Sequence, residues 1–182
     1  MTHEDKPTSA QNEGELFDVV DESDKVVGRL TRREVHAGGH LHRAVHVLVF
    51  GSDGRLFLQK RSMAKDSSPG LWDASCSGHV DAGESYDAAA CRELAEEIGL
   101  RFPKPPSRWF YIPACAETGN EFVWVYRCIA DGPFTLNRAE IECGKWYLLA
   151  DLANEISNAP HHFARPFRHI WQRVCGQDGT LC

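Results

Sequence analysis

Short apolar runs, several of them alternating with polar residues, follow one another along most of the chain and predict a domain rich in β-strands. Runs at 16–20 and 26–30 flank a short acidic turn, and runs at 45–50 and 55–59 flank an Asp-Gly turn. Paired runs around such turns are typical of β-hairpins. Further extended segments are expected at 71–80, 110–112, 122–129 and 146–149.

Helical spacing replaces this pattern in the middle of the chain, over residues 85–98. Its apolar residues recur four positions apart, at Ala90, Leu94 and Ile98. Ser85 can cap the amino end of this helix, and Gly99 stands where a helix closes in the left-handed conformation.

A second helix is expected near the carboxyl end, at about 163–174. Its apolar positions are Phe163, Phe167, Ile170 and Val174. Pro166 fits only the first turn of a helix, because proline has no backbone N–H to donate further along. Strands interspersed with two helices predict a mixed α/β domain.

Composition narrows the class of protein. The chain has 182 residues, 42% of them apolar and 25% charged, which indicates one globular domain at 15–176 between tails at 1–14 and 177–182. A net charge of −6 argues against binding nucleic acid through its phosphates. We expect no membrane contact and a cytoplasmic location, because the sequence has neither a long apolar stretch nor the apolar core of a secretory signal.

Three carboxylates share one surface of the central helix. Glu93, Glu96 and Glu97 are three or four positions apart, and Arg92 is the one basic residue between positions 82 and 100. One arginine cannot offset three negative charges, and hard carboxylate oxygens suit Mg²⁺ or Mn²⁺. The alternative interpretation is a solvated acidic face, which is the usual role of a charge run.

The residues around these glutamates decide between the two interpretations. Segment 78–100 matches G-x5-E-x7-R-E-U-x-E-E-x-G-U, with U aliphatic, at every fixed position. A chance match is on the order of one in a hundred million per window. The segment resembles the Nudix box, and the chain resembles the Nudix superfamily. That resemblance implies an α/β fold, an α/β/α sandwich with a mixed sheet, here extended by the N-terminal β-hairpin.

The resemblance also implies roles for individual residues. Nudix hydrolases cleave diphosphate bonds with a divalent metal, so a small-molecule diphosphate is the implied substrate, with nucleoside diphosphate derivatives the most frequent class. The glutamates Glu93, Glu96 and Glu97 would be catalytic and hold Mg²⁺ or Mn²⁺, and one of them would deprotonate the attacking water. Gly78 would offer its carbonyl to the metal, while the other positions of the motif would be structural: Glu84, Arg92 and Gly99.

Three residues outside the box are candidates for substrate binding. Lys60 and Arg61 end a predicted strand where relatives place phosphate-contacting cations, although a solvated strand end is the alternative. Glu140 matches a downstream carboxylate that many relatives place near the metals, although it could be an ordinary surface glutamate.

A closer resemblance, over about 17–152, is to the isopentenyl-diphosphate isomerase-like branch. It is carried by the segments Phe17-Asp18-Val19-Val20-Asp21-Glu22, Leu41-His42-Arg43-Ala44 and Ser77-Gly78-His79. True isomerases hold a second metal in a histidine and glutamate cage. The cage positions here would be His42, His79 and Glu121, with His36 displaced by one residue. Because lone histidines more often form hydrogen bonds than bind metal, a second metal remains an open alternative.

Two departures favour hydrolysis over isomerisation. Ser77 stands where isomerases have the catalytic cysteine, and Cys76, one residue earlier, would point to the opposite face of a strand. Gly119 replaces one glutamate of the acidic pair. We therefore expect a hydrolase, with an isomerase and a non-catalytic sensing module as alternatives. The complete set of box residues argues against the sensor, and a homodimer is compatible with the sequence.

Overall fold

Two sheets and four α-helices make up the computed structural model, which describes residues 12–177. The strands are β1 (Leu16–Val20), β2 (Val26–Thr31), β3 (His42–Phe50), β4 (Leu56–Arg61), β5 (Trp72–Asp73), β6 (Cys76–His79), β7 (Ser107–Ile112), β8 (Glu121–Ile129) and β9 (Ile141–Tyr147). The helices are α1 (Arg32–Gly38), α2 (Tyr86–Glu97), α3 (Leu149–Asn158) and α4 (Arg165–Gln177), with a 3₁₀ turn at Pro160–His162. The tails predicted at 1–14 and 177–182 fall mostly outside the described residues.

The main sheet is mixed and is built around β3. This strand runs parallel to β8 and antiparallel to β4 and β6, while β7 pairs with β8 and β9 with β4. Residues 45–49 of β3 are all buried, because helices cover both faces of the sheet at this point. A strand that is covered on both sides explains the continuous apolar run in the sequence.

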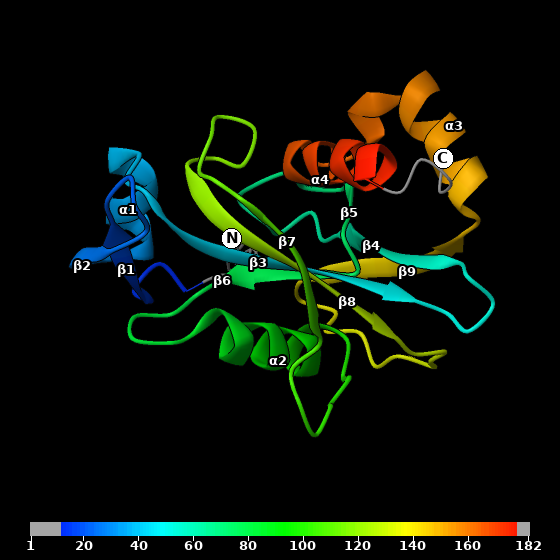
Figure 1. Cartoon of the computed structure of the whole chain (residues 1–182), viewed down its shortest axis with the longest axis horizontal. Coiled ribbons are helices and arrows are strands. Elements are labelled where there is room, and N and C mark those ends of the chain that lie inside the picture. Colours follow the sequence, from blue (N-terminus) through cyan, green and yellow to red (C-terminus); the bar gives the residue numbers. More distant parts are fainter. Residues whose placement is uncertain (1–11, 178–182) are drawn as a thin grey trace, which may run out of the picture.

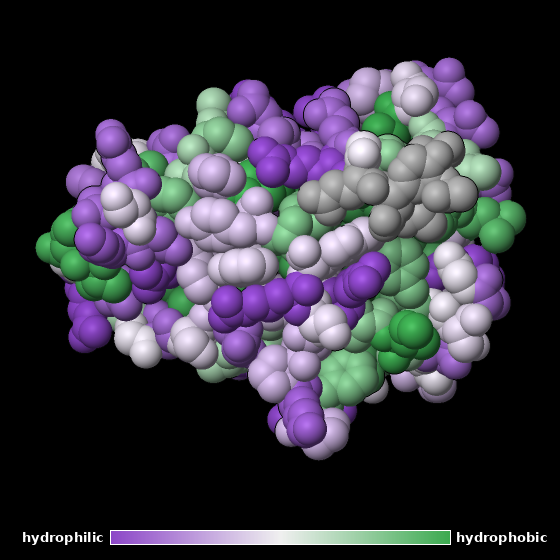
Figure 2. Space-filling model, viewed as in Figure 1, coloured by the Kyte–Doolittle hydropathy of each residue, from purple (hydrophilic) through white to green (hydrophobic). Residues whose placement is uncertain are grey.

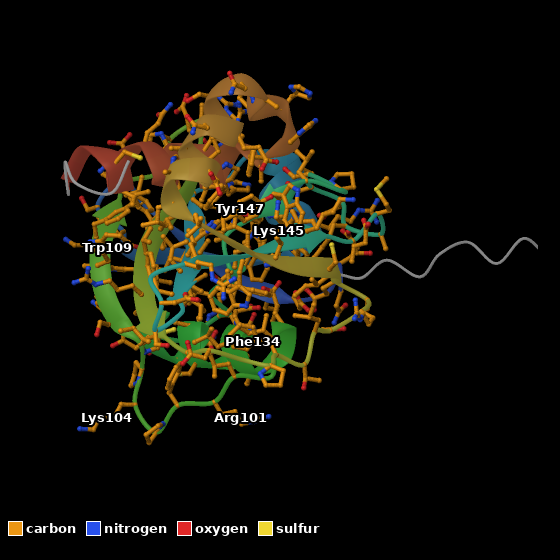
Figure 3. All side chains as sticks on the ribbon, turned by 90° about the vertical axis from the view of Figure 1, so that its right-hand side faces the viewer. Arg101, Lys104, Trp109, Phe134, Lys145 and Tyr147 are labelled. Carbon is orange, nitrogen blue, oxygen red and sulfur yellow. The ribbon has the colours of Figure 1, made fainter. Side chains whose placement is uncertain are left out.

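Helices lie on both sides of the main sheet, as Figure 1 shows. Leu94 and Ile98 belong to the core on the α2 side, and Phe167 and Ile170 to the core on the α3 and α4 side. Figure 3, turned by 90°, shows the strands between α2 on one side and α3 on the other. The predicted α/β/α sandwich is therefore confirmed.

The N-terminal hairpin is confirmed as a separate two-stranded sheet. Together with α1 it lies at one end of the molecule (Figure 1). Its turn residue Asp24 accepts hydrogen bonds from Arg43 of β3 at 2.6 Å, from Tyr86 of α2 at 2.9 Å and from Tyr111 of β7 at 3.3 Å. Three elements of the main domain thus hold the hairpin in place.

Apolar residues reach the surface on this hairpin. Val26 is 48% exposed and Val27 is 65% exposed, and Figure 2 shows hydrophobic surface at the same end of the molecule.

None of the helices in the range 12–177 is long and apolar enough to cross a membrane.

The central helix agrees with its prediction. Helix α2 begins after Ser85, whose hydroxyl accepts a hydrogen bond from the amide of Ala88 at 3.2 Å. Gly99 follows the helix with φ of 72°, a left-handed conformation that glycine adopts without steric cost.

The prediction of two helices was wrong, since α1 and α3 are also present. The predicted strand at 146–149 was misplaced as well: β9 runs from Ile141 to Tyr147, and α3 begins at Leu149. Helix α4 starts at Arg165, two residues later than expected, with Pro166 in its first turn.

Candidate active site

A cavity of about 660 Å³ is lined by residues of the hairpin, α1, β3, β6, α2 and the loops near them. Two clusters of candidate metal ligands lie at this cavity, and all their members except the buried Glu97 line it. The glutamate cluster consists of Glu93, Glu96, Glu97 and Glu140, and the histidine cluster consists of His36, His42, His79 and Glu121. Most of the residues predicted from the sequence are therefore brought to one place.

Strand β6 contacts both clusters: Ser77 and Gly78 lie against the glutamates, and His79 belongs to the histidine cluster. Successive side chains of a strand alternate between its two faces. Ser77 and His79 lie on the cavity wall, whereas Cys76 is fully buried in the core on the α2 side. Burial and the nearby carboxylates of Glu97 and Glu93 raise the pKa of the Cys76 thiol well above its usual value. The one-residue displacement of this cysteine thus removes its sulfur from the cavity.

Gly78 allows the strand to approach helix α2 closely. A Cβ atom added at this position would fall on the carboxylate of Glu93. The absence of a side chain therefore places the strand backbone directly against a candidate metal ligand, as the motif implies.

We expect Gly78→Ala to lower kcat strongly, because the added methyl group must push the Glu93 carboxylate out of position. A displacement of about 1 Å at a catalytic group costs on the order of 10²-fold in rate. Steady-state kinetics would measure the effect, and Gly28→Ala is the control, since a Cβ at Gly28 meets no atom within 4 Å. Unchanged kcat in Gly78→Ala would contradict the assigned position of Glu93.

Arg92 orients the carboxylates of the motif. Its guanidinium donates to both oxygens of Glu84 at 3.1 and 2.9 Å, and to the carbonyl of His79 at 2.9 Å. It also donates to Glu93 at 2.6 Å and to Glu96 at 3.2 Å. Glu84 in turn accepts a hydrogen bond from the amide of Asp81 at 3.2 Å. Glu84 and Arg92 are thus placed for the structural roles that the motif implies.

Glu97 is buried, and its two carboxylate oxygens differ. Oε2 accepts hydrogen bonds from the side-chain amide of Gln59 at 2.9 Å and from the backbone amide of Ser77 at 3.0 Å. Oε1 is buried and has no hydrogen-bond partner among the residues that the structure describes. An orphaned anionic oxygen in a protein interior is costly unless a cation binds there.

Burial raises the pKa of Glu93 and of Glu97, and the charge of Glu97 raises that of Glu93 further. Opposing contributions come from Arg92 at Glu93 and from Lys65 at Glu97. Glu96 differs from these two, because its side chain is 55% exposed. The cluster therefore holds more negative charge than its surroundings neutralise, which favours a bound cation.

Lys65 joins Glu140 to this cluster. Its Nζ lies 2.5 Å from Oε2 of Glu140 and 3.9 Å from Oε1 of Glu97, and its side chain is only 6% exposed. Glu140 also accepts a hydrogen bond from Asn137 at 3.0 Å. Lys65 was not predicted from the sequence, because it lies in the loop after β4 and belongs to no motif.

Lys60 and Arg61, predicted as a pair, are separated by the structure. Arg61 lines the cavity, donates to Asp73 at 3.0 Å and to the carbonyl of Ser67 at 2.9 Å. Lys60 lies outside the cavity lining and forms an ion pair with Glu142 at 2.9 Å. Of the two, Arg61 is the one positioned to meet a substrate in this cavity.

The histidine cluster is compact. The ligand atoms of His36, His42, His79 and Glu121 all lie within 4.8 Å of one another. Nε2 of His79 is 3.1 Å from Oε1 of Glu121 and 3.3 Å from Nε2 of His36. Phe17 of the hairpin stacks on both His42 and His79. The residues aligned with an isomerase cage thus meet in space.

A buried arginine also contacts this cluster. Arg32 donates to Nδ1 of His79 at 3.0 Å and to Asp66 at 2.7 Å. Because a guanidinium can only donate, Nδ1 is the acceptor, and the proton of the neutral ring is assigned to Nε2, facing Glu121. Burial lowers the pKa of His79 to about 4, although Glu121 opposes the shift. Burial alone would raise the pKa of Glu121, but the imidazoles of His42 and His79 beside its carboxylate outweigh burial and lower that pKa.

The two clusters suit different metals. The glutamate cluster offers only oxygen ligands, which Mg²⁺ and Mn²⁺ prefer, and its orphaned Glu97 oxygen fits such an ion. The histidine cluster mixes imidazole and carboxylate, which suits a transition metal. A metal bound through Nε2 of His79 would require the ring proton to move to Nδ1, and Arg32 to release that atom.

Comparison with known proteins gives a consistent result. The family model of the NUDIX domain matches residues 40–168. An isopentenyl-diphosphate Delta-isomerase 2 of Photorhabdus laumondii is 35% identical over 90% of this chain and 94% of its own. An uncharacterized Nudix hydrolase of Pseudomonas aeruginosa is 38% identical over 72% of this chain and 78% of its own. A crystal structure from Deinococcus radiodurans, 25% identical, superposes with a TM-score of 0.77 over 87% of this chain and 98% of that one.

Proposed function

The chain belongs to the NUDIX domain family, and from this premise we propose that it hydrolyses the diphosphate bond of a small molecule with Mg²⁺ or Mn²⁺. A nucleoside diphosphate derivative is the preferred substrate class. Family membership supports diphosphate hydrolysis in general. The complete set of motif residues supports it in this chain, since a module that only senses ligands does not need Arg92, Glu93, Glu96 and Glu97 together.

The observation that carries the proposal is the buried, under-neutralised pair Glu93 and Glu97 against the bare backbone of Gly78. Glu93, Glu96, Glu97 and the Gly78 carbonyl would hold the metal. When bound, the ion supplies positive charge for the phosphoryl oxygens and lowers the pKa of water. Arg92 fixes the direction of the glutamates, and one carboxylate of the cluster accepts the proton of the attacking water. Arg61, which lines the same cavity, would contact the phosphates of the substrate.

Isomerisation is the second candidate, because the histidine cluster assembles the aligned cage residues and close relatives carry isomerase names. Two features count against it. The proton-donating cysteine of isomerases is replaced by Ser77, whose hydroxyl is far less acidic than a thiol. Cys76 is fully buried in the core on the α2 side and is absent from the cavity lining.

Incubation with Mg²⁺ and a panel of diphosphates separates these functions. The panel contains nucleoside diphosphates, sugar nucleotides, dinucleotides and isopentenyl diphosphate, and chromatography identifies the products. We expect hydrolysis of a nucleoside diphosphate derivative that chelation of the metal stops, and no allylic isomer from isopentenyl diphosphate. We also expect Cys76→Ala to retain the hydrolytic activity. Allylic product that is lost in Cys76→Ala would instead favour the isomerase, and tight binding without turnover would favour a sensor.

A further inference from the structure

We propose that Lys65 is an internal counter-ion of the glutamate cluster, which occupies part of the metal position and must move away before a divalent ion can bind. This inference rests on the proposed function, because it takes the glutamate cluster as the metal site. On this proposal the Lys65 ammonium and the metal ion compete for the same carboxylates.

The position of the Lys65 ammonium carries the first step. Its Nζ contacts Glu140 at 2.5 Å while lying 3.9 Å from Oε1 of Glu97, the oxygen without a hydrogen-bond donor. Glu97 would be among the residues that hold the divalent ion, and Mg²⁺ keeps its oxygen ligands at about 2.1 Å, closer than the ammonium lies to this oxygen. The ammonium and such an ion would therefore compete for the same small volume.

Access to Glu97 gives the second step. Lys65 and Glu140 line the cavity. Glu97 does not belong to the lining, and its side chain is only 1% exposed. The lysine thus stands between the cavity and the orphaned oxygen of Glu97. Moving its side chain would open that oxygen to an ion arriving from the cavity.

The charge balance of the glutamate cluster also requires the Lys65 side chain to move. Arg92 is already shared among Glu84, Glu93 and Glu96, so Lys65 is the cation that neutralises Glu97 and Glu140. If a divalent ion entered while the ammonium stayed, two cations would face each other at roughly 3–4 Å in a partly dry site, which is strongly unfavourable. The flexible four-carbon stem of lysine allows Nζ to turn into the cavity instead.

Chemical labelling of the unmodified protein tests the proposal directly. The protein is treated with acetic anhydride with and without saturating Mg²⁺, and mass spectrometry measures acetylation at each lysine. We expect Mg²⁺ to increase acetylation of Lys65 several-fold, because Nζ leaves its buried ion pair. Lys60 is the internal control, since its ion pair lies outside the cavity and its acetylation should not change. Equal acetylation of Lys65 in both conditions would overturn the proposal.

A titration with Mn²⁺, followed by electron paramagnetic resonance of the free ion, gives an independent measure. We expect Lys65→Met to bind Mn²⁺ about tenfold more tightly than the unmodified protein, which is a moderate coupling between two binding events. Lys60→Met is the matched control and should bind as the unmodified protein does. Equal or weaker binding by Lys65→Met overturns the proposal, and the labelling experiment decides the question if that variant does not fold.

The two proposals fail in different ways. If the unmodified protein takes up no Mn²⁺ and hydrolyses no diphosphate, the proposed function fails and this inference fails with it. If it binds Mn²⁺ and hydrolyses its substrate while Lys65 responds in neither experiment, only the role of Lys65 is wrong.

Discussion

Glu97→Gln should reduce kcat on the order of 10²- to 10³-fold, the loss typical of removing one preorganised charge from an active site. The glutamine is nearly isosteric, and its oxygen can still accept the hydrogen bonds that Gln59 and Ser77 donate to Oε2. Its amide nitrogen replaces the orphaned Oε1, so the negative charge that would bind the metal disappears. Initial rates with Mg²⁺ and the best substrate of the panel measure the effect.

Stability should behave differently from activity in this variant. Burial and neighbouring carboxylates disfavour the charge of Glu97 in the metal-free protein, so its removal should leave the metal-free Tm unchanged or raise it. The stabilisation that added Mg²⁺ gives should disappear, because a ligand that no longer binds cannot shift the unfolding equilibrium. Glu142→Gln is the control, since Glu142 pairs with Lys60 outside the cavity. Full activity in Glu97→Gln would remove Glu97 from the metal site.

Arg92→Lys is the second large effect that we expect, in both stability and rate. The Arg92 guanidinium meets both oxygens of Glu84, one oxygen each of Glu93 and Glu96, and the carbonyl of His79. A lysine has three donors on one atom and cannot reproduce this fork. Loss of charge-assisted bonds in this half-buried network should lower the free energy of unfolding by about 2 kcal/mol. Because the metal ligands would then be misdirected, kcat should also fall 10- to 100-fold, the loss typical of changing a residue that orients metal ligands.

Urea unfolding without metal and steady-state kinetics with Mg²⁺ measure the two effects of Arg92→Lys separately. Arg165→Lys is a suitable control, because Arg165 forms a single exposed ion pair with Glu117 at 3.2 Å. A change of that kind usually alters stability by less than about 0.5 kcal/mol. If Arg92→Lys were as mild as the control, the guanidinium fork would not be what orients the glutamates.

The elements that could be predicted from the sequence have strong local signals. The Asp-Gly turn predicts the β3–β4 hairpin, and the spacing of Ala90, Leu94 and Ile98 predicts α2, because both signals come from residues close together in the chain. Helix α1 had a signal that went unused: Thr31 and Glu34 form a capping box that marks its start.

Helix α3 also carried a signal that went unused, because Leu149, Leu152, Ala153 and Ile156 recur at helical spacing and pack on the core. Strand β9 has no such signal. In β9 the small residue Gly144 makes room for the ring of Phe57, and the exposed residues Glu142 and Lys145 hide the strand pattern. These positions are set by contacts with distant segments, which a single sequence does not display.

The same limit applies to the site. The motif fixes the glutamates of α2 and Gly78, since these lie within one continuous segment. Lys65 and Arg32 reach the cavity from a loop and from α1, and their partners are far away in the chain. His36, displaced by one residue from the aligned cage, still reaches His79 because it lies on a helix, where one position rotates a side chain by about 100° instead of reversing it.

The anchoring of Asp24 has a consequence for how this cavity could change over evolution. The hairpin and α1 precede residue 40, where the match to the family model begins, yet they supply Phe17, Arg32 and His36 to the lining of the cavity. Substitutions in these elements would therefore alter the reach and polarity of that lining without changing the candidate metal-binding carboxylates of α2. The hydrogen bonds to Asp24 could hold the hairpin in place while its cavity-facing residues change, and a different substrate could then be accommodated.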